Sequence, residues 1–60
     1  MSLTLTPNIE KPDAFYEMLT DAQREMSDEE ANDMNARLVL ILANQIGDLD
    51  DLKQAIDLAK

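Results

Sequence analysis

Arg37 and Asn44 are the two side chains of this 60-residue sequence whose types and spacing best suit molecular recognition. They are seven residues apart, so a helix would place them on the same face, two turns from each other. Asp33 precedes Arg37 by four residues, a spacing that also allows a solvated ion pair along the helix. The alternative is that the Arg37 guanidinium binds a carboxylate in bidentate fashion across an interface. The spacing therefore predicts either a polar helix edge or a contact with a partner.

Residues for catalysis or metal binding are scarce. The sequence has no histidine and no cysteine, which removes the commonest general base, the commonest metal ligand and all thiol chemistry. The acidic groups at Asp28–Glu30 and Asp48–Asp51 do not form a calcium loop, because Leu52 stands at the third ligand position and no glycine follows. They suit helix starts instead. Because nucleophile, base and cofactor motif are all missing, we expect no enzyme activity, cofactor or metal.

The charge balance limits the classes of partner. The chain has 13 acidic and 5 basic residues, a formal net charge of −8. This acidic excess predicts that neither a nucleic acid nor an anionic membrane is a partner, since both require a positive patch. The N-terminus lacks the features of a signal peptide, and the longest apolar run falls far short of the roughly 18 residues of a membrane helix. We therefore expect a cytoplasmic protein with a solvated acidic surface, steering toward a basic partner being the alternative.

The elements that must position these residues are predicted to be helices. Residues 1–11 suit an extended arm, which Leu3, Leu5 and Ile9 could anchor on the helices; a loose arm and an arm that reaches a second chain are the alternatives. Proline is favoured in a first helical turn, so Pro12 marks the start of a first helix over 13–26. The fold class is therefore an all-α three-helix unit with an N-terminal arm, the arm over 1–11 and the helical domain over 12–60.

Local signals define the second and third helices more closely. Ser27 followed by Glu30 is a capping box, and Gly47 falls where a left-handed residue ends a helix, so the second helix spans 28–46. Asp48 can cap a third helix over 49–59. The connections are short, which predicts that neighbouring helices are antiparallel or meet at a steep angle.

The second helix is apolar on nearly all sides. An arc of roughly 160° that includes Leu38, Val39, Ile41 and Leu42 is wide enough to face both other helices. Leu40 is left on the opposite side, between the small residues Ala36 and Ala43. Such a helix normally lies inside a larger protein. We therefore expect a homodimer or another protein partner to cover the back of this helix; a monomer that uses its arm is the alternative.

The predicted interface follows from this helical wheel. Its residues are those on the back and polar edge of the second helix, with one leucine on the far side of the third: Ala36, Arg37, Leu40, Ala43, Asn44 and Leu58. Asn35 falls inside the apolar arc, so we expect a buried amide paired with a helix end or with Tyr16. A role in setting the register between helices is the alternative.

Two separated motifs, PDAFYEML and NARLVLILANQIGD, resemble a family of short bacterial proteins classed as a domain of unknown function. The resemblance covers Pro12 to about Leu52. Members often have a histidine before IGD, where this chain has Gln45, so any imidazole-dependent role in relatives would be missing here. The resemblance implies no established activity or site residues.

A non-enzymatic interaction module that self-associates through the second helix is the expected function. The alternative is an accessory subunit or small-ligand carrier for a bacterial metabolic enzyme, with Arg37 and Asn44 facing the ligand. The resemblance links that alternative to flavin-dependent aromatic oxygenation.

Overall fold

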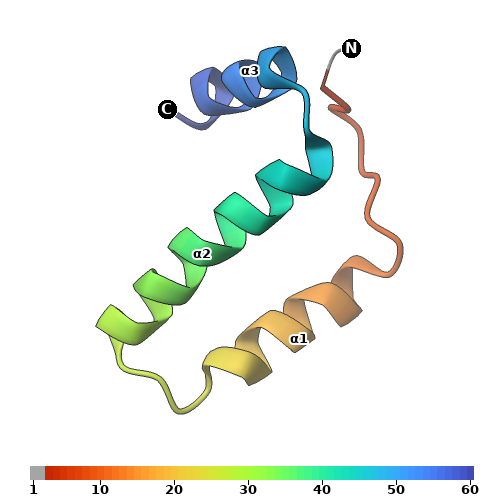
Figure 1. Ribbon diagram of the computed structural model, residues 1–60. Coiled ribbons are helices and arrows are strands. Elements are labelled where there is room, and N and C mark those ends of the chain that lie inside the picture. The colour runs from red at the N-terminus through yellow and green to blue at the C-terminus, as the bar shows by residue number, and fades with distance from the viewer. Residues whose placement is uncertain (1–2) are drawn as a thin grey trace.

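A computed structural model describes residues 3–60, and these residues form three α-helices and no strand (Figure 1). Helix α1 spans Pro12–Gln23, α2 spans Asp28–Ile46 and α3 spans Leu49–Ala59. An extended arm precedes α1. The predicted all-α three-helix class is confirmed.

Helix α1 begins as predicted and ends earlier. Pro12 occupies its first turn, and the carbonyl of Lys11 accepts hydrogen bonds from the amides of Ala14 and Phe15 at 3.0 and 3.2 Å. The predicted end near Met26 is wrong, because the helix stops at Gln23. Ser27 adopts an extended backbone conformation to cap α2, so the chain must leave the helix before it. Residues 24–26 serve as the connecting turn.

The signals that bound α2 are present as predicted. The Glu30 amide donates to Ser27 Oγ at 3.2 Å, and the Ser27 amide donates to Glu30 Oε1 at 3.0 Å. Gly47 closes the helix in the left-handed region, with φ of 79°, and its amide donates to the carbonyl of Ala43. Asp48 then caps α3, since the Asp51 amide donates to Asp48 Oδ2 at 3.2 Å.

The three helices are spread apart rather than packed into one bundle (Figure 1). Helices α1 and α2 fold back on one another from their connecting turn and diverge away from it, while α3 lies across the far end of α2 (Figure 1). The arm returns from the start of α1 toward α3. The radius of gyration is 13.2 Å, whereas a compact 60-residue domain has about 10.4 Å. The chain is therefore expanded for its length.

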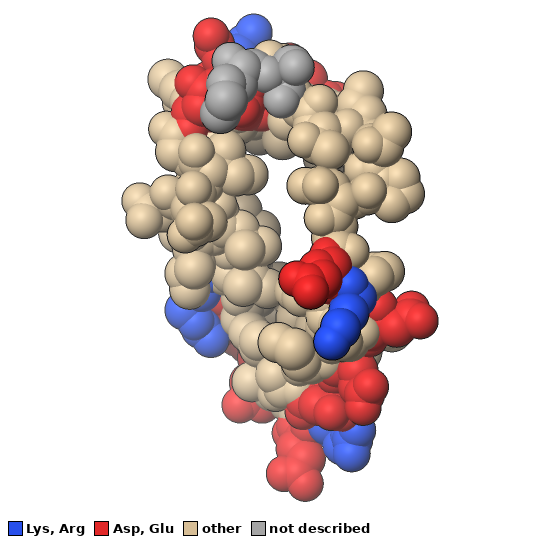
Figure 2. All heavy atoms as spheres, turned by 90° about the vertical axis from the view of Figure 1, so that its right-hand side faces the viewer, with Lys and Arg blue, Asp and Glu red and all other residues tan. Residues whose placement is uncertain are grey.

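No apolar side chain is buried within residues 3–60. Val39, Ile41 and Leu42, which were predicted to be covered by the other helices, are exposed. This prediction is wrong because α1 meets α2 beside the turn and then leaves it. Figure 2 shows the result as an opening through the molecule, surrounded mainly by uncharged side chains, with charged ones gathered above and below it.

The predicted anchoring of the arm is only partly present. Leu3 is half-buried, but Leu5 and Ile9 are exposed. On α3, Leu52 is half-buried while Leu49 and Ile56 remain exposed. Each helix thus presents an apolar stripe that the rest of the chain leaves largely uncovered. Across residues 3–60, none of the helices combines the length and apolar character that crossing a membrane requires.

Candidate interaction surface

The residues predicted to form an interface on α2 share an exposed face. We define the outer face of α2 as Ala36, Arg37, Leu40, Ala43 and Asn44, which lie within about 60° of Leu40 on a helical wheel. Leu40 is 71% exposed. Ala36, Arg37 and Asn44 are also exposed, while Ala43 is half-buried. The helix therefore brings five of the six predicted residues together on one surface.

Arg37 provides the single charge of this surface. It is the only charged residue between Met34 and Gly47. The ion pair with Asp33 that the spacing allows is not formed, and within residues 3–60 the side chain of Arg37 has no hydrogen bond or ion pair. Its guanidinium is thus available to an acceptor outside the described chain. The outer face combines an apolar centre with one unpaired cation on its flank.

Leu58, the sixth predicted residue, lies elsewhere. It lines a shallow depression between the arm and α3, together with Leu3, Leu5, Gln54 and Asp57. No residue of the outer face of α2 lines this depression. Leu58 is 68% exposed, so the arm covers it only in part. The structure therefore separates Leu58 from the other predicted residues.

Asn35 marks the polar contact between α1 and α2. Gln23 Nε2 donates to Asn35 Oδ1 at 2.7 Å and approaches Met34 Sδ at 3.7 Å. The prediction that Asn35 is buried is wrong, since it is exposed. Of the two predicted partners, a helix end and Tyr16, the first is present, because Gln23 is the last residue of α1. Gln23 was missed as a functional residue. Its signal was present in the sequence, because a wheel places it on the side of α1 that also carries Leu19.

The acidic residues at the start of α3 have a structural role. Asp51 is only 6% exposed, and its Oδ1 atom has no hydrogen-bond partner among residues 3–60. Burial raises the pKa of the Asp51 carboxyl, and the neighbouring Asp48 carboxyl raises it further. Within residues 3–60 no three potential ligands gather closely enough to hold a metal ion. The geometry fits the helix start that the sequence predicts.

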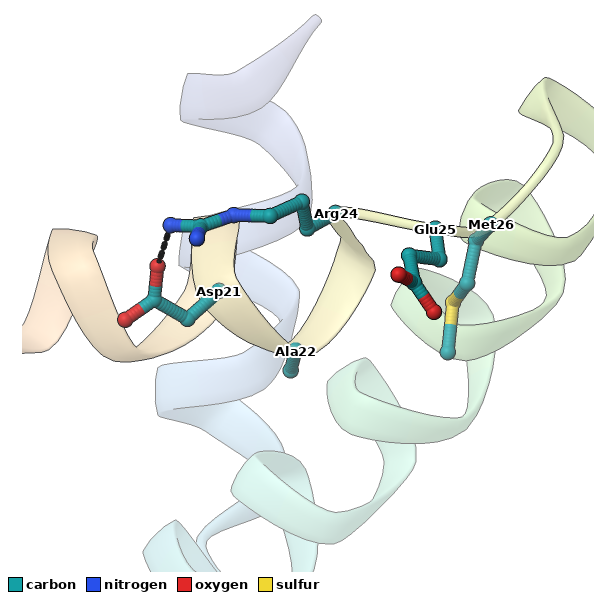
Figure 3. A pocket seen from close by; sticks show the side chains of 5 residues that line it. All are labelled: Asp21, Ala22, Arg24, Glu25 and Met26. Atoms are coloured by element: carbon teal, nitrogen blue, oxygen red, sulfur yellow. Dashed lines mark hydrogen bonds and ion pairs between the residues drawn. The ribbon is translucent and has the colours of Figure 1, made fainter.

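A second depression lies at the end of α1 (Figure 3). Its lining residues are Asp21, Ala22, Arg24, Glu25 and Met26. Arg24 reaches back along the helix and forms an ion pair with Asp21, while Glu25 and Met26 lie on the side of the turn. The charge of Arg24 is therefore already neutralised within the chain, and the depression has no group specialised for a ligand.

Comparison with known proteins gives a family without a known activity. Residues 3–60 match the family described as Protein of unknown function (DUF2783). No curated protein and no solved structure matches the chain. The match extends beyond both motifs that carry the resemblance, and it includes all three helices and most of the arm. The chain belongs to the DUF2783 family.

Proposed function

We propose that this protein is a non-enzymatic interaction module of the cytoplasm, in which α2 packs against a second copy of the chain. The observation that carries the proposal is the area left exposed. A folded domain of 6.8 kDa exposes about 3,950 Å², whereas this chain exposes 5591 Å². The difference of about 1,600 Å² per chain is surface that a compact fold would have buried.

This area fits a stable dimer. Two chains that each bury about 1,600 Å² give a total of about 3,200 Å², inside the range of roughly 2,000–5,000 Å² for obligate homodimers. Interfaces of that class are apolar and resemble a domain core divided between two chains. The exposed stripes of α1, α2 and α3 supply such a surface. A contact on the outer face of α2 would cover part of this area, because Val39, Ile41 and Leu42 lie on the other side of the helix.

The charge distribution favours a contact through α2. A chain of net charge −8 repels its own copy unless the contact avoids the acidic residues. Between Met34 and Gly47 this side of α2 carries no acid, and Leu40 stands at the centre of that stretch; Asp33 lies on the same line nearer the start of the helix. Pairing centred on Leu40 buries apolar area and keeps the Asp33 carboxylate at the end of the contact, away from its centre, where desolvation would be costly.

The proposal is tested by sedimentation equilibrium of three proteins: wild type, Leu40→Glu and Thr20→Glu. Leu40→Glu places a carboxylate at the centre of the interface, so we expect association to weaken at least about 100-fold, or roughly 2.7 kcal/mol. Thr20→Glu is the matched control. It adds the same charge on an exposed site of α1 where the hydroxyl bonds only to backbone carbonyls of its own helix.

We expect wild type and Thr20→Glu to sediment with twice the 6.8 kDa chain mass and Leu40→Glu with the chain mass. Circular dichroism reports whether each variant keeps its helices. A dimer of unchanged affinity in Leu40→Glu would exclude the outer face of α2 as the contact, and a wild-type monomer would exclude self-association.

A further inference from the structure

We propose that the two copies pair through α2 in antiparallel orientation, with Leu40 near the two-fold axis and Arg37 of each chain beside Asn44 of the other. This inference rests on the proposed self-association and adds its geometry. It follows from which residues share the outer face of α2 and where the charges lie along it.

The position of Leu40 sets the centre. It is the one large apolar side chain on the outer face, with Ala36 and Ala43 on one flank. Small residues beside a single leucine allow two helices to approach at the short end of the 8–10 Å range of helix packing. In an antiparallel pair about a two-fold axis at Leu40, the two leucines meet and each Ala36 lies beside Ala43 of the other copy.

Arg37 and Asn44 lie together on the opposite flank. In an antiparallel pair the same flanks of the two helices face each other, and a centre at Leu40 brings Arg37 of one copy within one residue, or about 1.5 Å along the axis, of Asn44 of the other. The amide oxygen of Asn44 can accept from the guanidinium. Helix α2 has three acids in its first turn and no basic residue in its last. Arg37 of the second copy would supply the cation that favours a helix C-terminal end.

A parallel pair is disfavoured by Asp33. This residue also lies close to the line of Leu40 on the helical wheel and is exposed. Parallel pairing would place Asp33 of the two copies face to face at the same height, where like charges repel. Antiparallel pairing places it opposite Gly47. The chain turns sharply after Gly47, and α3 crosses the end of α2 instead of extending it (Figure 1).

Cysteine cross-linking tests the orientation, because the chain has no cysteine of its own. Ala36→Cys and Ala43→Cys are prepared separately, mixed, and oxidised. A disulfide requires the two Cα atoms to lie within about 7 Å. Antiparallel pairing satisfies this requirement between positions 36 and 43, whereas two copies of position 36 are offset by about 12 Å along the helix axis.

We expect the mixture to form a covalent dimer of one Ala36→Cys and one Ala43→Cys chain, identified by mass spectrometry, and either variant alone to form at least ten-fold less covalent dimer. Self-cross-linking of Ala36→Cys alone would overturn the antiparallel geometry in favour of a parallel pair. A non-covalent dimer by sedimentation that cross-links in none of these samples would overturn the α2 geometry while leaving self-association intact. A monomer in every sample would reject the proposed function itself.

Discussion

At the scale of single residues, the capping box gives the chain its clearest titration signal. The backbone amide of Ser27 donates to the Glu30 carboxylate, and this bond, followed by the effect of the nearby Ser27 hydroxyl, lowers the Glu30 pKa below its ordinary value of 4.5. A lowered pKa in the folded state stabilises the fold above the unfolded value and stops doing so as pH falls through the folded value.

Glu30→Gln removes this contribution. We expect the variant to unfold at a lower urea concentration than wild type at pH 7, because a neutral amide accepts the Ser27 bond less strongly than a carboxylate. The difference should shrink as pH falls below about 4.5 and vanish once the wild-type carboxyl is protonated. Urea unfolding at fixed chain concentration across pH 7 to 2 measures it.

Glu25→Gln is the control for the change in net charge, since Glu25 lies outside the capping box. If Glu30→Gln and wild type unfold at the same urea concentration throughout the pH range, the capping bond contributes no stability and the account of this helix start is wrong.

The contact between Gln23 and Asn35 was predictable from the sequence only in part. The helical wheel correctly indicated that Asn35 lies on the side of α2 that meets another element. The partner could not be assigned, because that requires the angle at which α1 leaves the turn. Hydrogen bonding within one helix start depends on neighbours in sequence, whereas Gln23 and Asn35 are twelve residues apart.

At the scale of the helices, Gly47 ends α2 and directs α3 across it. Its φ of 79° is a conformation that other L-residues adopt at a cost, and a Cβ there would meet no atom closer than the Asn44 carbonyl oxygen at 3.9 Å. We expect Gly47→Ala to lower the free energy of unfolding by about 1 kcal/mol through backbone strain alone. Urea unfolding measures this loss.

Gly47→Asn is the matched control, because asparagine tolerates the left-handed region better than alanine. It should lose less stability than Gly47→Ala. If both variants lose the same amount, then the side chain rather than the backbone conformation is responsible.

The bounds of α2 and α3 were predictable because each depends on a local signal: the capping box, Gly47 and the Asp48 cap. The end of α1 was not, since no glycine or proline marks it and its apolar pattern continues to Met26. Helix α1 ends at Gln23 because Ser27 must adopt an extended conformation to cap α2. Helix ends without a capping residue are therefore the weak point of the prediction.

At the scale of the whole molecule, residues 3–60 form three helices without a buried apolar core. Its apolar stripes were predictable from periodicity, and so was the excess of apolar surface on α2. What covers the stripes was not, because a helical wheel does not distinguish a neighbouring helix of the same chain from one of another copy. We predicted that helices of the same chain cover Val39, Ile41 and Leu42, but these side chains are exposed in the single chain.

If the core forms between copies, folding and association are one process. Helix content should then depend on chain concentration, because isolated helices of 11–19 residues are marginal in water without packing. A chain that folds alone would keep its helices at any dilution.

The most direct test is therefore a dilution series of the wild-type chain, from about 100 µM to about 10 nM, in which mass and helix content are measured on the same samples. We predict that the mass falls from twice the chain mass to the chain mass, and that the circular dichroism signal of the helices is lost over the same concentration range. If the protein has the mass of one chain throughout the series and keeps its full helix signal, the claim that the second copy completes the fold is contradicted.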